Sequence, residues 1–184
     1  RIDVFDRTFT PVSMPGGFKD PRIPPGFAPF GIQNINGDLY VTYAKQDKEG
    51  EDDVAGPGLG FVNVFDANGN LLRRVATRGA LNAPWGLALA PADFGEFSNR
   101  LLVGNFGDGT IAAYDVHDGR FVGRLTKPNG ALLRIEGLWG IQFGNGILNQ
   151  PINVLFFAAG PDDENHGLYG SIQATRGDGD HRSD

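Results

Sequence analysis

The sequence predicts an all-β protein of the β-propeller class, built from blades of four short antiparallel strands. An aromatic–Gly–apolar motif occurs as PFGIQNI, PWGLALA and LWGIQFG, with central glycines at Gly31, Gly86 and Gly140. Further short apolar runs follow each motif, and four strands in a repeat of roughly 40 to 55 residues are typical of a propeller blade. No run of about ten or more residues shows helical periodicity, which argues against a fold with helices between the strands.

Each element is assigned by its position in the repeat. GDLYVTYA, RLLVGNF and NVLFFAAGP are expected second strands, GFVNVFD and GTIAAYD third strands, and NLLRRVAT and RFVGRLT fourth strands. The opening RIDVFDRTFTPVSM matches the third and fourth strands of a unit. We expect Arg73 and Arg74, in NLLRRVAT, to protect an exposed outer edge with their charge. The predicted units are a half blade over residues 1–14, whole blades over 29–77 and 84–126, an incomplete blade over 138–175, and a polar, disordered tail over 176–184.

These units amount to about three to three and a half blades, whereas propellers close with four to eight. The run VLFFAA is apolar on both alternating faces, so its strand is expected to be covered on both sides by sister sheets. An open partial ring would leave apolar faces and strand edges in water. The predicted partner is therefore the remaining half of the propeller, supplied by a missing N-terminal segment or by a second copy of the chain.

The composition argues against several classes of partner. The net charge of −6 is unfavourable for a protein whose main partner is nucleic acid or an anionic membrane. No apolar run approaches the roughly 20 residues that span a bilayer. The chain has no cysteine, which excludes disulfides, thiolate zinc sites and a cysteine nucleophile.

Longer motifs suggest a family. LNAPWGLALAP, LLVGNFGDGTIAAYD, EGLWGIQFGNG and LFFAAGPDDENHGLYGSI resemble a family of uncharacterised, mostly secreted bacterial and fungal propeller proteins, and the match extends from Arg1 to about Ala174. More distantly, PWG and RIDVFD are similar to NHL repeats and to the gluconolactonase, regucalcin and paraoxonase group. The resemblance implies a closed ring of six blades, of which this chain is the C-terminal half, and an extracellular or cell-surface location. It implies no particular activity.

Three acidic or amide-rich loops are expected at one end of the channel. They are KQDKEGEDDVAGPGLG, NFGDG and GPDDENHG. Calcium prefers oxygen ligands of these types, and the candidate metal ligands are Asp52, Asp53, Asp108, Asp162 and Asp163. The alternative is that the loops are solvated turns, and DKEGEDD does not follow the calcium-loop pattern. We favour a solvated loop for the first insert alone, with calcium or a cationic ligand as the alternative for the three together.

The candidate ligand-binding residues are Trp85, Trp139, Asn105 and His166. The two tryptophans precede repeat glycines, where they could stack on a sugar or another ring. The favoured alternative is that they wedge between blades as core residues. His166 could serve as a general base oriented by Asp163 or Glu164, or be an ordinary surface histidine.

The function predicted from these features is an extracellular β-propeller that acts as a ligand-binding or surface-structural module. The alternative is a calcium-dependent hydrolase of the lactonase type, with its site on the acidic loop face and calcium as a Lewis acid. The sequence assigns no catalytic residue, because no serine lies in the strand-turn-helix setting that a nucleophile elbow requires.

Overall fold

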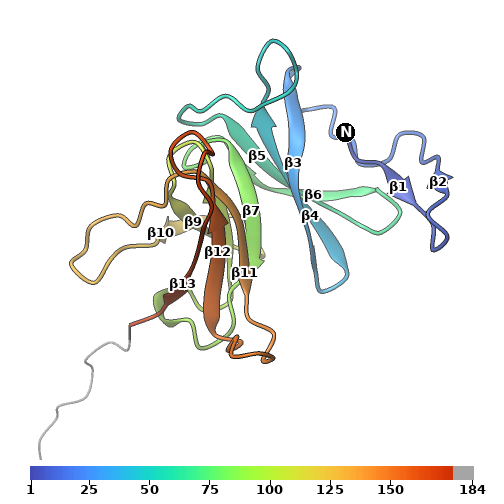
Figure 1. Ribbon diagram of the computed structural model, residues 1–184. Helices are drawn as coiled ribbons and strands as arrows, with labels where there is room; N and C mark the ends of the chain where they lie inside the picture. The colour runs from blue at the N-terminus through green and yellow to red at the C-terminus, as the bar shows by residue number, and fades with distance from the viewer. Residues whose placement is uncertain (176–184) are drawn as a thin grey trace, which may run out of the picture.

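Four antiparallel β-sheets form the computed structural model, which describes residues 1–175 (Figure 1). The N-terminal pair contains β1 (Val4–Phe5) and β2 (Pro11–Val12). The first sheet contains β3 (Phe27–Ile35), β4 (Asp38–Lys45), β5 (Gly60–Phe65) and β6 (Leu71–Thr77). The second sheet contains β7 (Pro84–Leu89), β8 (Arg100–Asn105), β9 (Ile111–Asp115) and β10 (Phe121–Arg124). The third sheet contains β11 (Leu138–Phe143), β12 (Val154–Ala159) and β13 (Leu168–Gln173).

Within each sheet, strands that are neighbours in sequence are also neighbours in space. This up-and-down order confirms the predicted all-β fold with antiparallel propeller blades. Within residues 1–175 the one helical element is η1, a 3₁₀ turn at Gly95–Phe97. No helix of these residues is long and apolar enough to cross a membrane. The predicted disordered tail, 176–184, lies outside the described residues.

The connections from first to second strands and those from second to third strands lie at opposite ends of the sheets. Asn36 and Gly37 form a two-residue turn between β3 and β4, and both have positive φ, which the type I′ hairpin requires. The loops from β4 to β5, β8 to β9 and β12 to β13 begin at the other end of the sheets, where β3, β7 and β11 start. The three acidic or amide-rich loops therefore share the end of the channel at which the repeated aromatic residues lie.

Apolar side chains fill the space between neighbouring sheets. One cluster lies between the first and second sheets and another between the second and third. The repeat glycines let the first strands approach closely: a Cβ at Gly31 would overlap the Trp85 carbonyl, and one at Gly86 would lie 2.9 Å from the Ile141 nitrogen. A Cβ at Gly140 would meet nothing within 4 Å, because no further sheet follows β11 among the described residues.

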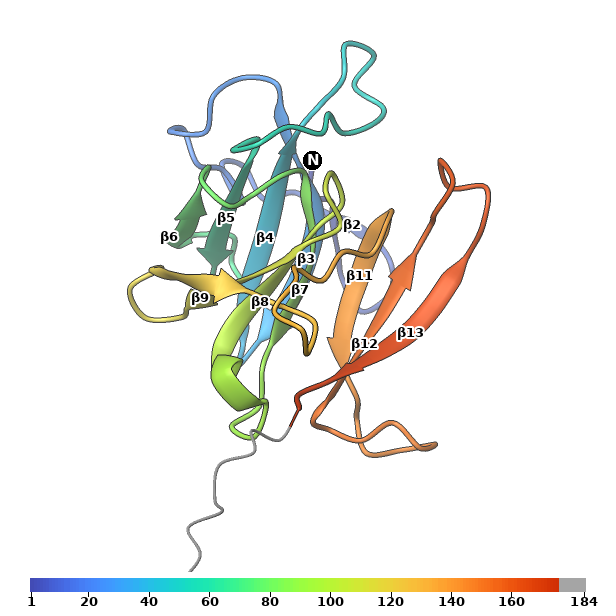
Figure 2. The same ribbon diagram turned by 90° about the vertical axis from the view of Figure 1, so that its left-hand side faces the viewer.

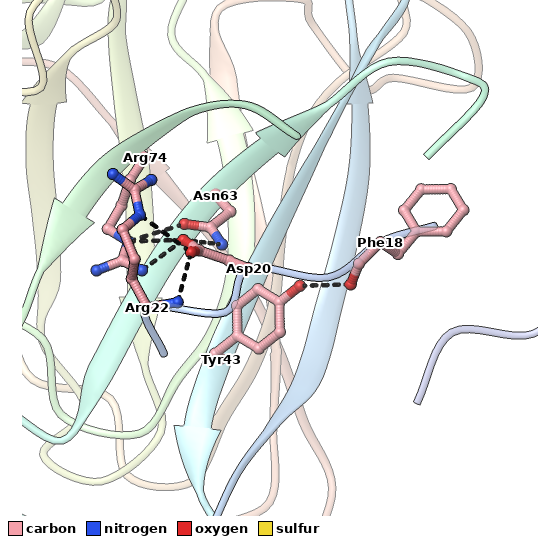
Figure 3. Close-up of polar contacts among 6 residues, drawn as sticks. All are labelled: Phe18, Asp20, Arg22, Tyr43, Asn63 and Arg74. Atoms are coloured by element: carbon pink, nitrogen blue, oxygen red, sulfur yellow. Dashed lines mark hydrogen bonds and ion pairs between the residues drawn. The ribbon is translucent and has the colours of Figure 1, made fainter. Parts of the chain in front are cut away.

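The far face of the first sheet is covered by the segment that precedes β3. Asp20, whose side chain is fully buried, forms an ion pair with Arg74 of β6 and accepts a hydrogen bond from Asn63 Nδ2 of β5 at 3.2 Å (Figure 3). The Tyr43 hydroxyl of β4 donates to the Phe18 carbonyl at 3.4 Å. The expectation that Arg74 protects an exposed edge is wrong, because its side chain is only 16% exposed and neutralises this buried carboxylate.

The far face of the third sheet is open. Phe156 of β12 stacks on Tyr169 of β13 with ring centroids 5.9 Å apart, and Tyr169 is 64% exposed. The opposite face of the same sheet places Leu155 and Ile172 against the second sheet. The sequence expectation that VLFFAA is covered on both sides is therefore met on one side only, within the part of the chain described.

Candidate functional site

A hollow of about 300 Å³ runs along the first strands of the three sheets, where a propeller has its channel. Its lining comes from equivalent positions of the repeat on β3, β7 and β11: Phe30, Gly31, Ile32, Gln33, Trp85, Gly86, Leu87, Trp139, Gly140 and Ile141. Both tryptophans of the chain thus lie at one site. The repeat brings them together although they are far apart in sequence.

Trp85 is held rigidly at the mouth of the hollow. Its ring packs against those of Phe30 and Phe106, with centroids 5.5 and 5.3 Å away. Its indole N–H donates a hydrogen bond of 2.9 Å to Asp53 Oδ1, from the loop between β4 and β5. Trp85 is half-buried beside two aromatic neighbours, and both its packing role and its role in ligand binding stay predictions.

Asp53 is the most perturbed carboxyl group at this end of the channel. Burial raises its pKa to about 6, the indole hydrogen bond opposes this rise, and the negative charges of Asp52 and Glu164 add to it. Its second oxygen, Oδ2, is buried without a hydrogen-bond partner among the described residues. A buried acid with one unpaired oxygen is unfavourable as a carboxylate, so Asp53 ionises near neutral pH rather than near pH 4.

Trp139 has a different environment from Trp85. Its indole N–H donates a 2.7 Å hydrogen bond to Glu164 Oε1, from the loop between β12 and β13. Gly160 lies against its six-membered ring, where a Cβ would overlap it. No aromatic ring of residues 1–175 is stacked on Trp139, although both tryptophans are half-buried.

An exposed amide pair joins the first and third sheets beside the hollow. Gln33 of β3 donates from Nε2 to Gln142 Oε1 of β11 at 3.1 Å. The two residues occupy the same position of the repeat, and the equivalent residue of β7 is Ala88. The small side chain of Ala88, on the intervening strand β7, leaves room for the two amides to meet.

The loop between β8 and β9 uses its polar groups internally. Asn105 is fully buried, and its amide accepts from the Asn82 nitrogen and donates to the Ala80 carbonyl and the Thr110 hydroxyl. Asp108 Oδ1 accepts from both the nitrogen and the hydroxyl of Thr110. These bonds fix the loop, and the roles of Asn105 in ligand binding and Asp108 in metal binding stay predictions.

The third loop carries the remaining predicted residues on its surface. His166 Nε2 lies 3.4 Å from Asp162 Oδ2, with both side chains more than 70% exposed, and Asp163 is exposed beside them. His166 is therefore next to Asp162 rather than the predicted Asp163 or Glu164, and Glu164 instead accepts the Trp139 N–H. Among residues 1–175 no three acidic or histidine side chains are grouped as metal ligands. Calcium binding by Asp52, Asp53, Asp162 and Asp163 stays a prediction without an observation that favours it.

Sequence reasoning missed four residues of the site: Glu164, Gln33, Gln142 and Phe106. Aligning the repeat one position further would have found the two glutamines, since they follow Ile32 and Ile141 directly. Phe106 and Glu164 lie in loops, where repeat position carries no information about contact. No signal in the sequence pairs Glu164 with an indole.

The chain is similar to uncharacterised proteins of Acanthamoeba polyphaga mimivirus. One is 36% identical over 94% of this chain and 43% of its own length, and a second is 36% identical over 93% of this chain and 46% of its own length. A third is 39% identical over 77% of this chain and 27% of its own length. The chain thus spans less than half the length of the curated relatives it matches.

No family model matches the sequence. Among solved structures, a glucose dehydrogenase aligns with a TM-score of 0.47 and 14% identity, over 80% of this chain and 40% of that one. The assignment of the fold rests on the sheets themselves, which are antiparallel, consecutive in sequence and packed face to face.

Proposed function

We propose that this chain is a ligand-binding module of the β-propeller class, with its site in the hollow along β3, β7 and β11. The observation that carries the proposal is the contrast between the two tryptophans. Trp85 packs against the rings of Phe30 and Phe106, whereas no aromatic ring of residues 1–175 stacks on Trp139, whose N–H is held by Glu164. A rigid aromatic ring beside polar groups is typical of sites that select a ligand by stacking and orient it by hydrogen bonds.

The chemistry around Trp139 favours a neutral sugar as the ligand class. The C–H face of a pyranose is apolar and stacks on an indole ring, and its hydroxyls require donors and acceptors at the edge. The amides of Gln33 and Gln142 and the carboxylate of Glu164 supply both types of group. Acidic residues at the mouth disfavour an anionic ligand.

Intrinsic fluorescence gives a direct test, because both tryptophans of the chain line this hollow. We expect neutral oligosaccharides such as cellotetraose and chitotetraose, used as probes, to shift or quench the emission of the full chain. Trp139→Phe should abolish most of the response. Trp85→Phe should retain the response, because the ring of Trp85 already packs against Phe30 and Phe106 rather than against a ligand. Acrylamide should quench Trp139 more strongly than Trp85.

The opposite pattern would contradict the proposal. If no probe changes the emission and acrylamide fails to reach Trp139, the ring is a packing residue and the hollow is closed. If Trp139→Phe leaves the response to sugar unchanged, the sugar binds elsewhere.

The wider setting of this module is also a proposal. The motif resemblance supports a complete ring of six blades, a relation to the secreted bacterial and fungal propellers, and an extracellular or cell-surface location. An intact-mass measurement of the natural polypeptide, together with cell fractionation, tests these points.

A further inference from the structure

The amide pair of Gln33 and Gln142 lies beside the proposed sugar site. β7 packs against both β3 and β11, so the first strands of the three sheets run next to one another (Figure 2). The pair connects β3 with β11 across β7, and Gln33 lines the hollow itself. Trp139 and Gln142 are three residues apart on β11, which corresponds to roughly 10 Å along a strand. The hollow therefore has an aromatic end and an amide end.

The bond between the two side chains does not use all of their hydrogen-bonding groups. A side-chain amide carries one carbonyl oxygen and two N–H groups. The bond from Gln33 Nε2 to Gln142 Oε1 leaves Gln33 Oε1 and Gln142 Nε2 without a side-chain or backbone partner among residues 1–175. The pair therefore retains both an acceptor and a donor for a ligand.

Apolar side chains of the hollow lie next to these amides. Ile32 and Leu87 belong to its lining, and Ile32 is 52% exposed although it is a large aliphatic residue. Ile32 directly precedes Gln33, and both line the hollow. A ligand group that contains an amide and a methyl group matches this combination, because its polar part is hydrogen-bonded while its apolar part leaves water.

We propose that the site selects sugars that carry an acetamido group, and that Gln33 and Gln142 recognise this group. The Gln33 carbonyl accepts from the acetamido N–H, Gln142 Nε2 donates to the acetamido carbonyl, and the methyl group packs on Ile32. A sugar with a hydroxyl group at the same carbon lacks the carbonyl and the methyl group, so it forgoes two of these contacts. The inference rests on the proposed sugar site and adds a preference to it.

The experiment compares two probes that differ at one position of each ring. Chitotetraose and cellotetraose have the same length and linkage, and only chitotetraose carries acetamido groups. Each is titrated into the full chain, and Kd is measured by isothermal titration calorimetry, with tryptophan emission as a second reading. We expect chitotetraose to bind roughly five-fold more tightly or better, because hydrogen bonds between neutral groups at a partly solvated site contribute modestly.

Gln142→Glu isolates the contribution of one N–H donor. Glutamate has nearly the same shape and still accepts from Gln33, but its carboxylate has no N–H for the acetamido carbonyl. We expect the Kd of chitotetraose to approach that of cellotetraose, whose own Kd should change less than about two-fold. Gln173→Glu is the matched control, because Gln173 is exposed on β13 and does not line the hollow, so neither Kd should change.

Ile32→Ser tests the methyl contact separately. Ile32 is largely exposed, so its replacement should leave Tm nearly unchanged. We expect this variant to weaken the binding of chitotetraose and to leave that of cellotetraose unchanged.

The outcomes separate this inference from the sugar site itself. Equal affinity for the two probes overturns the selection of acetamido groups and leaves the sugar site standing. A preference that persists in both Gln142→Glu and Ile32→Ser overturns the inference, because the acetamido group is then recognised elsewhere. An equal loss of both probes in Gln142→Glu also overturns it, because the amides then bind ring hydroxyls. If neither probe binds the full chain at millimolar concentration, the sugar site and the inference fall together.

Discussion

The two ends of the stack of sheets present opposite faces of the blade repeat and meet different surroundings. On the first sheet, Phe61 and Phe65 are almost fully buried beneath the segment that contains Phe18 and Asp20. On the third sheet, Phe156 and Tyr169 form an aromatic pair that faces solvent. The far face of the first sheet is therefore buried because another part of the polypeptide, the segment with Phe18 and Asp20, covers it.

The covered face also shows how a charged group is accommodated between the covering segment and the first sheet. Asp20 has no exposed side-chain surface, yet Arg74 and Asn63 satisfy it, and Arg22 donates to it from the backbone and the side chain. These bonds, opposing the cost of burial, lower the pKa of Asp20 to about 2. The interaction fixes the register of the covering segment on the sheet.

The largest expected effect comes from removing this carboxylate. Asp20→Ala leaves the largely buried Arg74 without a charged partner, with Asn63 Oδ1 as its remaining side-chain acceptor, so we expect a loss of about 3 to 5 kcal/mol in the free energy of unfolding. Urea denaturation measures this loss. Asp3→Ala is the control, because the ion pair of Asp3 with Arg1 is exposed and should contribute little. Equal effects of the two substitutions would show that the covering segment is not fixed by Asp20.

The repeat glycines provide the next largest contrast. Gly31→Ala drives a methyl group into the Trp85 backbone, so we expect destabilisation of about 1 to 3 kcal/mol or more. Gly140→Ala adds the same methyl group where nothing lies within 4 Å, so it should be neutral in this chain. Thermal unfolding of both variants measures the difference. A destabilising Gly140→Ala would mean that another surface already packs against β11.

The repeat made the fold predictable, whereas the contacts of single loop residues were not. Spacing of Gly31, Gly86 and Gly140 predicted which strands share a position, and the structure confirms the antiparallel sheets that follow from it. Asp20 was missed because it lies in a proline-rich connection, where neither periodicity nor a motif marks a buried residue. Arg74 does lie on an outer strand, but its expected contact with water was wrong because the covering segment brings Asp20 against it.

The candidate site was predictable to the same extent. Trp85 and Trp139 were identified from the repeat, because equivalent positions of neighbouring blades lie side by side around the channel. Their hydrogen bonds to Asp53 and Glu164 depend on how two loops fold back, and loop conformation follows from local turns rather than from the repeat. The acidic composition of the loops was visible, but which acids would be buried was not.

Two carboxyl groups sharpen the comparison through their opposite dependence on pH. The pKa of Asp20 is lowered to about 2, so its contribution to stability is present above about pH 4 and lost as the pH falls towards 2. The pKa of Asp53 is raised to about 6, so its contribution is present below about pH 4 and lost as the pH rises through 6. We therefore expect Asp53→Asn to remove a fall in Tm between pH 4 and 7. A Tm profile of Asp53→Asn that matches the original chain would show that Asp53 is solvated.

The smallest effect should come from the open face. Tyr169→Ser removes an exposed ring that stacks on Phe156 and a hydroxyl that accepts an exposed 3.4 Å hydrogen bond from Gln150 Nε2, so the free energy of unfolding of the isolated chain should change by less than about 0.5 kcal/mol. Phe61→Ala, on the covered face of the first sheet, should cost about 3 to 5 kcal/mol because it leaves a cavity. Urea denaturation of this pair measures how much the cover contributes. A large effect of Tyr169→Ser would mean that β12 and β13 are already covered in solution, and the contrast between the two faces would then belong to the isolated chain only.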